Sequence, residues 1–122
     1  MANSIVTTAC DNELVILAYT PSASYELCQI LSGNSQPVNV TLGIVPGQYV
    51  NTIVLNGVNQ PLTSTVNQNL PSGTYSILML GVNWGGPTQF TVNVNGTPYE
   101  LPFTQQGPLG LTFNPGPVTI TV

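Results

Sequence analysis

The sequence contains no lysine, no arginine and no histidine, and four carboxylates are its only charged side chains in 122 residues. Charged residues make up 3% of the chain, against about 25% in an ordinary soluble domain. Nucleic-acid binding depends on cations that neutralise phosphates, and attraction to anionic membranes depends on the same cations. We therefore expect neither nucleic acid nor a membrane as a partner, and no salt bridge between side chains.

The missing residue types also exclude most catalytic machinery. Without His, Lys or Arg there is no base for a nucleophile triad, no Schiff-base amine and no phosphate clamp. A pair of carboxylates, as in glycoside hydrolysis, remains. Asp11 and Glu13 are two positions apart and would share a face of an extended chain, whereas Glu26 and Glu100 are distant in sequence. Such short acidic stretches usually shape turns, so we expect no enzyme, no catalytic residue and no cofactor.

Metal sites also lack a motif. The oxygens of Asp11, Asn12 and Glu13 suit calcium, but the stretch has none of the spacing of a calcium-binding loop. Cys10 and Cys28 lack the spacing and the histidines of a zinc site. We expect no metal, and we expect the cysteines to be buried thiols, with a single disulfide as the alternative.

Long hydrophobic runs are absent too. No apolar run approaches the ~20 residues of a membrane span, and the start "MANSIVTTACDNE" has no basic segment followed by an apolar one. We therefore expect synthesis in a host cytoplasm without a signal peptide. Hydrophobic residues make up 42% of the sequence and are spread along it, which is typical of a folded chain. The length predicts a single domain over residues 1–122.

No segment keeps a helical apolar period, whereas 12 Gly and 11 Pro separate short apolar or alternating runs. This pattern predicts an all-β fold without significant helix, an antiparallel β-sandwich of the immunoglobulin-like or jelly-roll Greek-key kind, with nine to ten short strands. The run "LVILAY" at 14–19 is typical of a strand buried on both sides. The alternating run that begins at residue 38 places four side chains on one face: Val38, Val40, Leu42 and Ile44.

Two Asn-Gly pairs predict tight hairpins, because both central residues of a type I′ turn need positive φ. These pairs are Asn56-Gly57 and Asn95-Gly96. In the second hairpin Val94 should face Thr97, with two further pairs, Val92–Tyr99 and Phe90–Leu101. Pro98 lacks an N–H donor and should lie on an edge strand or at a non-bonded position.

Both ends of the sequence are short strand-like segments. Unpaired edge strands can extend the sheet of a neighbouring molecule through main-chain hydrogen bonds. The residues we expect on such edges are Ile5, Val6, Val118, Ile120 and Val122.

The only tryptophan, Trp84, lies in the stretch "LMLGVNWGGPTQF" at 78–90. We expect its ring to close the end of the sandwich or to meet a neighbouring subunit. A platform on which a sugar stacks is the alternative. The residues we expect at an interface or a ligand platform are Trp84, Asn83, Tyr99 and Phe103.

Two resemblances extend these expectations. The segment "LPSGTYSILML" resembles the PxGTYxxxV segment of bacterial immunoglobulin-like domains, which implies that its Gly forms a turn and its Tyr packs against or caps the loop. In size, composition and expected fold, the chain resembles the small β-sandwich decoration (cement) proteins of bacteriophage capsids. That resemblance implies a structural virion protein that stabilises a shell through subunit contacts. Its partners would be the major capsid protein and other copies of the chain, with a trimer as the expected homo-oligomer.

Two other functions fit the same sequence. A carbohydrate-binding lectin or adhesin module would use the neutral amides and the aromatic residues. A self-assembling extracellular filament subunit would use strand donation.

Overall fold

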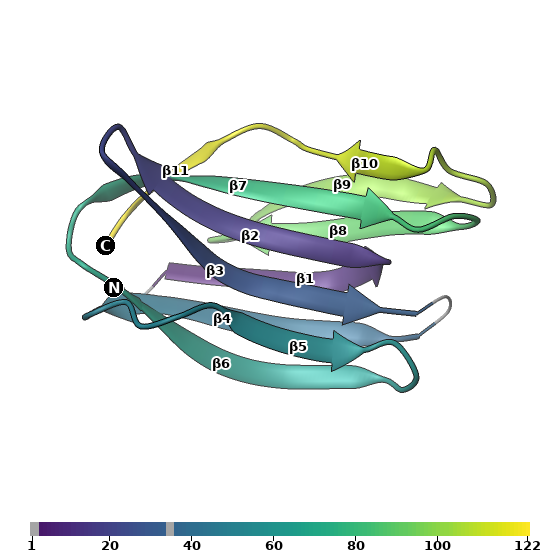
Figure 1. Cartoon of the computed structure of the whole chain (residues 1–122), viewed down its shortest axis with the longest axis horizontal. Helices are drawn as coiled ribbons and strands as arrows, with labels where there is room; N and C mark the ends of the chain where they lie inside the picture. Colours follow the sequence, from purple (N-terminus) through teal and green to yellow (C-terminus); the bar gives the residue numbers. More distant parts are fainter. Residues whose placement is uncertain (1–2, 34–35) are drawn as a thin grey trace.

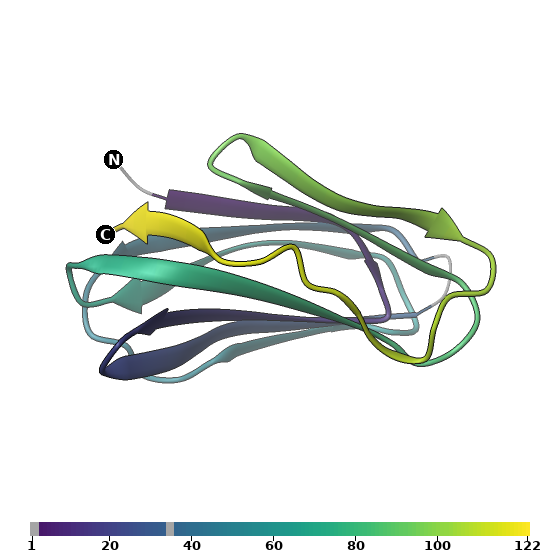
Figure 2. The same ribbon diagram turned by 90° about the horizontal axis from the view of Figure 1, so that it is seen from above.

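The computed structural model describes residues 3–33 and 36–122, whose strands form two sheets packed face to face (Figure 1). The strands are β1 (Asn3–Asp11), β2 (Glu13–Thr20), β3 (Ala23–Ser32), β4 (Val38–Pro46), β5 (Ile53–Gly57), β6 (Leu62–Leu70), β7 (Thr74–Asn83), β8 (Thr88–Val94), β9 (Thr97–Thr104), β10 (Gly110–Phe113) and β11 (Val118–Thr121). The five-stranded sheet has the order β6-β4-β1-β8-β9. The six-stranded sheet has the order β10-β7-β2-β3-β5, and β11 also pairs with β7. Figure 2 shows the two layers from above.

The predicted all-β sandwich is confirmed, with eleven strands among the described residues where nine or ten were expected. The sheets are not purely antiparallel, because β5 runs parallel to β3 and β6 runs parallel to β4. Strands β3 to β6 alternate between the two sheets. The chain therefore winds around one edge of the sandwich, and each return brings a strand beside an earlier one in the same direction.

The hairpin predicted at Asn56-Gly57 is wrong. Both residues belong to the end of β5, and β6 then begins at Leu62 in the opposite sheet. The Asn56 side-chain oxygen accepts a hydrogen bond from the Val58 N–H at 3.1 Å, so the chain does turn there. The turn leads across the sandwich, since β5 pairs with β3 instead of β6. The prediction failed because a local turn signal does not specify which sheet the next strand joins.

The hairpin predicted at Asn95-Gly96 is confirmed. The two residues have φ values of 50° and 92°, as the tight turn requires. All three predicted cross-strand pairs are present: Val94–Thr97, Val92–Tyr99 and Phe90–Leu101. Pro98 lies on β9, which is an edge strand as expected.

The edge position predicted for Ile5 and Val6 is wrong. Their strand, β1, is central in its sheet and pairs with β4 on one side and β8 on the other. Strands that come later in the sequence, β4 and β8, pair with the two sides of β1. Nothing within the sequence of β1 itself indicates that both of its sides are paired. At the other end of the chain, β11 pairs with β7 and places Val118 and Ile120 at the edge of the six-stranded sheet. Val122 follows and exchanges two main-chain hydrogen bonds with Gly73, at 2.9 and 2.8 Å.

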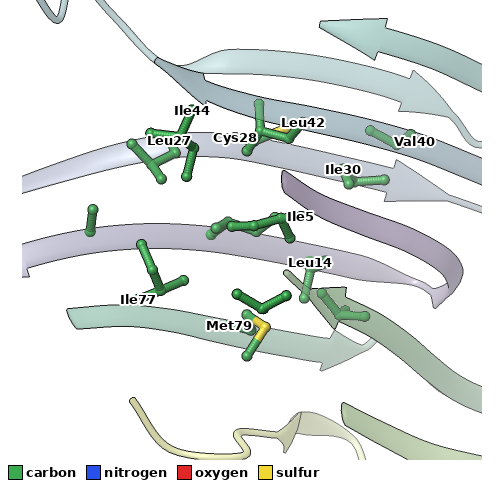
Figure 3. Close-up of a cluster of buried hydrophobic side chains, with 14 of the residues drawn as sticks. Ile5, Leu14, Leu27, Cys28, Ile30, Val40, Leu42, Ile44, Ile77 and Met79 are labelled. Carbon is green, nitrogen blue, oxygen red and sulfur yellow. The ribbon is translucent and has the colours of Figure 1, made fainter. Parts of the chain in front are cut away.

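The core lies between the sheets, where side chains of both layers meet (Figure 3). The residues of β4 predicted to share a face are all buried: Val38, Val40, Leu42 and Ile44. From the other sheet, Leu14 and Met79 are fully buried against them in the same cluster. Phe90 and Phe113 stack with ring centroids 5.2 Å apart and planes inclined by 8°. This alternation of buried and outward residues leaves each sheet with a separate outer face.

The two cysteines are free thiols, and both are buried in this core. Burial raises the pKa of Cys28 to about 11. The pKa of Cys10 is raised further, by burial and by the nearby Asp11 and Glu13 carboxylates. The thiols are therefore protonated at neutral pH and serve as small apolar packing groups.

Tyr75 closes the loop before β7. Its ring is buried, and its hydroxyl donates a hydrogen bond to the Pro71 carbonyl at 2.7 Å. The packing and capping implied by the PxGTY resemblance are both present at this residue. Its ring also meets that of Tyr25 edge-on, with centroids 6.1 Å apart.

Candidate functional site

The outer faces of the two sheets differ in chemistry. On the five-stranded sheet, the residues that alternate with the core positions are mostly Thr and Asn. They include Asn39, Thr41, Thr63, Thr65, Asn67, Asn69, Thr91 and Asn93. Such a polar composition is usual for a sheet face that meets water.

The outer face of the six-stranded sheet is apolar at its centre. We call this centre the apolar face and define it by outward residues of the neighbouring strands β2 and β7: Val15, Leu17, Leu78, Leu80 and Val82. Val15 pairs with Leu80 and Leu17 pairs with Leu78, so the side chains form rows across the sheet. The viewer of Figure 1 looks onto this side of the sandwich, with β7, β2, β3 and β5 in front.

Further apolar side chains surround the apolar face. Leu111 on β10 is 58% exposed and lies beside Val82, and Leu31 on β3 lies beside Glu13. Val54 on the edge strand β5 is 55% exposed. The two carboxylates on this side are Glu13, at the end of β2, and Glu26 on β3. Glu13 lies beyond Val15 at the end of β2, whereas Glu26 pairs directly with Leu17, so one carboxylate borders the middle of the apolar face.

The sequence run "LVILAY" was predicted to be buried on both sides, and in the single chain it is buried on one. Leu14, Ile16 and Ala18 are fully buried in the core. Val15 and Leu17 point the other way and remain half-buried. The pattern therefore predicts more burial than one copy of the chain provides.

Trp84 lies at one end of this side of the sandwich and is 46% exposed. Its main-chain N–H donates to the Asn12 side-chain oxygen at 2.7 Å, and its indole N–H donates to a Glu13 oxygen at 3.3 Å. The other Glu13 oxygen accepts a hydrogen bond from the Gln29 amide at 2.6 Å. Glu13 projects from the outer face of the sheet, since its neighbours Asn12 and Leu14 are buried. The hydrogen bond from the indole to Glu13 therefore holds the ring on that outer face. The ring therefore extends the apolar face beyond Val82.

Asn83 was predicted beside Trp84 at an interface or ligand platform, and the structure places it in the interior instead. Its side chain is 1% exposed. The amide nitrogen donates to the carbonyls of Pro108 at 2.9 Å and Gly86 at 3.3 Å, and the amide oxygen accepts from the Gly85 N–H at 3.1 Å. These bonds hold the loop after β7 and join it to the segment before β10, so the Asn83 amide is not available to a ligand. The strand period would have placed it inward, because Val82 faces outward.

Tyr99 and Phe103 do not join Trp84 in one patch, because both lie on β9 of the other sheet. Tyr99 is half-buried and packs against the core. Phe103 is 58% exposed and lines a surface cavity of about 280 Å³. Other residues that line this cavity are Thr8, Asp11, Gln36 and Gln89. The expected set of four residues is therefore divided among three places in the fold.

Asp11 and Glu13 do not form a carboxylate pair either. Asp11 ends β1 in the five-stranded sheet, and Glu13 begins β2 in the six-stranded sheet. The chain crosses between the sheets at Asn12, whose main-chain oxygen accepts a hydrogen bond from the Ser32 N–H at 2.7 Å. The expectation of a shared face assumed an extended chain through Asn12. Within residues 3–33 and 36–122, no three His, Cys, Asp or Glu side chains gather to hold a metal, and no helix could span a membrane.

Lowering the pH should stabilise the folded protein through protonation of Asp11. One carboxylate oxygen of Asp11 is buried without a hydrogen-bond partner. Burial raises the pKa of this carboxyl, against a weaker opposing effect of a hydrogen bond with the Asn12 side chain. A raised pKa in the folded state means that the stabilisation is present at low pH and is lost as the pH rises through the folded value.

We therefore expect the free energy of unfolding to increase between about pH 7 and about pH 3. The increase should be smaller in Asp11→Asn, which is neutral throughout. Urea titrations of both proteins across this pH range measure the difference. Equal pH dependence in the two proteins would contradict the assignment to Asp11.

Comparisons with known proteins returned no match: no family model, no curated protein and no solved structure is significantly similar to this chain. We therefore infer a function from the surface of the chain.

Proposed function

We propose that this chain is a structural subunit that acts by burying the apolar face in an assembly. The observation that carries the proposal is the contrast between the two outer faces, one rich in Thr and Asn and the other in Leu and Val. Proteins that remain single in water rarely keep a contiguous apolar patch of more than a few hundred Å² uncovered. Leu17 and Leu78 are half-buried in the single chain, and a partner would bury both completely.

Within this class, the role we propose is that of a capsid decoration (cement) protein on a bacteriophage virion. Such a protein forms homo-oligomers and contacts the major capsid protein. The absence of cationic side chains supports this role, because contacts between apolar and amide groups keep their strength when the ionic strength changes. The size of the chain and its sandwich of strands without helix also suit a small subunit seated on a shell.

The test is binding to shells. Capsids from a phage whose genome encodes this chain, prepared from a deletion mutant that lacks it, are mixed with the purified protein. We expect the protein to sediment with the shells and to raise the temperature at which they release DNA. Failure to sediment with the shells at any protein concentration would reject the decoration role. Electron microscopy of the protein alone separates this role from a filament subunit, which would form fibres.

Carbohydrate binding is the second candidate, and the exposure of Trp84 is the observation that favours it. The ring is held in one orientation by Glu13, and its exposed part is open to a ligand. The neighbouring amides of Asn12 and Asn83, however, are buried and hydrogen-bonded within the chain. A glycan array with Trp84→Ala as the control decides, since binding that disappears in the variant would support a lectin.

A further inference from the structure

We propose that the free edge of β6 pairs antiparallel with the same edge of a second copy of this chain, around a two-fold axis at Thr65. The five-stranded sheets of the two copies would then form one continuous sheet. β6 ends its sheet, and β4 is its only partner among the described strands. Figure 1 shows β6 along the lower edge of the sandwich. This edge is separate from the apolar face, and the inference does not depend on the decoration role.

The main-chain groups of β6 point alternately towards β4 and away from it. The pairing of the two strands runs over nine consecutive residues without a shift of register. At one end the Leu62 N–H donates to the Pro37 carbonyl at 3.0 Å, and at the other end the Leu70 carbonyl accepts from the Gly47 N–H at 2.9 Å. The even-numbered residues therefore face β4. The odd-numbered residues direct their N–H and C=O groups outward, and these residues are Thr63, Thr65, Asn67 and Asn69.

The outward row of donors is limited at both ends. The Asn69 N–H donates to the side-chain oxygen of Gln68 at 3.0 Å, so this donor is already satisfied within the chain. At the opposite end, Pro61 precedes Leu62 and has no N–H. The donors that remain belong to three residues, of which the second lies midway between the others: Thr63, Thr65 and Asn67.

This row is complementary to itself, which favours a second copy over a different protein. In an antiparallel pair, two residues opposite each other can exchange both of their main-chain hydrogen bonds. A two-fold axis at Thr65 places this residue opposite its own copy and places Thr63 opposite Asn67 of the other copy. Each remaining donor then meets a carbonyl of the partner strand. Such a contact closes with two copies, whereas the expected trimer needs two different surfaces.

The other sheet edges are protected against such pairing, and the edge of β6 is not. β9 contains Pro98 and Pro102, carries Glu100 between them and pairs with β8 in an irregular register. Prolines, charges and bulges keep an edge strand from pairing with another chain. β5, β10 and β11 are only five, four and four residues long. β6 has nine residues and contains neither a proline nor a charge.

Charge does not oppose the contact. β4 and β6 carry no charged residue, and the carboxylates of this sheet belong to β1 and β9. Glu26 of the other sheet lies towards one end of β6, because the Gln68 amide donates to the carbonyl of the adjacent Leu27 at 2.9 Å. The axis at Thr65 places the Gln68 residues of the two copies at opposite ends of the contact, ~20 Å apart along the strands. Salt screens charges at such a separation.

The side chains of β6 also suit the contact. On the inner face, the axis places Val66 opposite Ser64 and places Leu62 opposite Gln68. Leu62 and Val66 are only partly buried in the single chain, so pairing would cover them further. On the outer face, a Cβ at Gly43 would collide with the Asn67 side-chain oxygen, so this amide lies over β4 and leaves the edge open.

Sedimentation equilibrium of the purified full chain tests the pair, with two substitutions at one residue. Thr65→Pro removes the central donor from each copy, whereas Thr65→Val keeps it. We expect a mass of two chains for the wild type and for Thr65→Val at concentrations up to about 1 mM. We expect the dissociation constant of Thr65→Pro to rise by roughly 30-fold or more, because the central hydrogen bonds are lost. The fold should remain intact, since an edge strand tolerates proline where its N–H faces solvent.

A charge at the axis tests the same contact without changing the main chain. Thr65→Glu places two carboxylates opposite each other, and like charges in that position oppose strand pairing. Thr119→Glu makes the same change at an exposed residue of β11 and is the matched control. We expect the dissociation constant to rise by about 5-fold in Thr65→Glu and to return towards the wild-type value in high salt. Thr119→Glu should pair as the wild type does.

A cross-link tests the register. Thr63→Cys and Asn67→Cys proteins are prepared separately and then oxidised mildly, either alone or mixed, with the native thiols buried. The axis at Thr65 places the two new thiols opposite each other in the mixed pair, within reach of a disulfide. In a pair of identical variants the new thiols are ~14 Å apart along the strands. We therefore expect a disulfide in the mixture and none in either variant alone.

Three results would overturn the proposal: a monomeric or trimeric wild type, pairing that survives both Thr65→Pro and Thr65→Glu, or the absence of a disulfide specific to the mixture. The test also distinguishes this pair from the decoration role. Shell binding by a wild type that does not pair would reject this inference alone. A pair that binds no shell would reject only the decoration role.

Discussion

Replacing Phe90 by alanine is expected to lower the free energy of unfolding by about 4 kcal/mol. The side chain is fully buried, and its ring stacks on that of Phe113 at 5.2 Å. Gly81 faces the same ring so closely that an added Cβ there would lie 2.8 Å from it, and the glycine has no side chain that could refill the space. The loss combines the removed apolar contact with the cavity that remains.

Phe103→Ala is the matched control, because it makes the same chemical change at a ring that is 58% exposed. We expect its effect to stay within about 0.5 kcal/mol. Urea unfolding at one fixed protein concentration, followed by circular dichroism, measures both variants. Similar losses in Phe90→Ala and Phe103→Ala would show that the packing between the sheets does not dominate stability.

The second large effect is expected from Asn83→Ala, which should cost about 2–3 kcal/mol. The substitution leaves the Pro108 carbonyl and the Gly85 N–H without their side-chain partner at a partly buried site. It also releases the segment that positions Trp84, the only tryptophan, so its fluorescence emission should change in the folded protein.

Asn67→Ala is the control for this change, since Asn67 projects from the outer face of β6 into solvent. We expect it to leave both stability and emission close to those of the wild type. The same urea titrations, read by fluorescence, give both quantities. If Asn83→Ala unfolds at the same urea concentration as Asn67→Ala, the structural role assigned to the Asn83 amide is incorrect.

Local patterns predicted the parts of this fold that local geometry controls. The Asn95-Gly96 turn set the register of its hairpin, because a two-residue turn with positive φ allows one pairing of the flanking strands. The alternation from Val38 to Ile44 predicted which side of β4 is buried, because side chains of a strand point to opposite faces in turn.

The same reasoning failed where a segment joins distant parts of the chain. Asn56-Gly57 has the same turn chemistry as Asn95-Gly96, yet the strand after it lies in the other sheet. The strand that contains Ile5 was predicted at an edge and is central. Sheet order depends on which strands bury the most surface together, and that is a property of the whole chain.

The sequence by itself determined that the chain forms a sandwich, that it has no cationic chemistry, and that "LVILAY" is apolar on both sides. These properties follow from composition and from the two-residue period of a strand. Only the tertiary structure decided that one side of β2 faces the core while Leu17 and its neighbours on β7 face outward. It also decided that Trp84 lies at one end of that face, where Glu13 holds its indole. The physical reason is that strand pairing, which no single segment encodes, places separate apolar runs side by side on one surface.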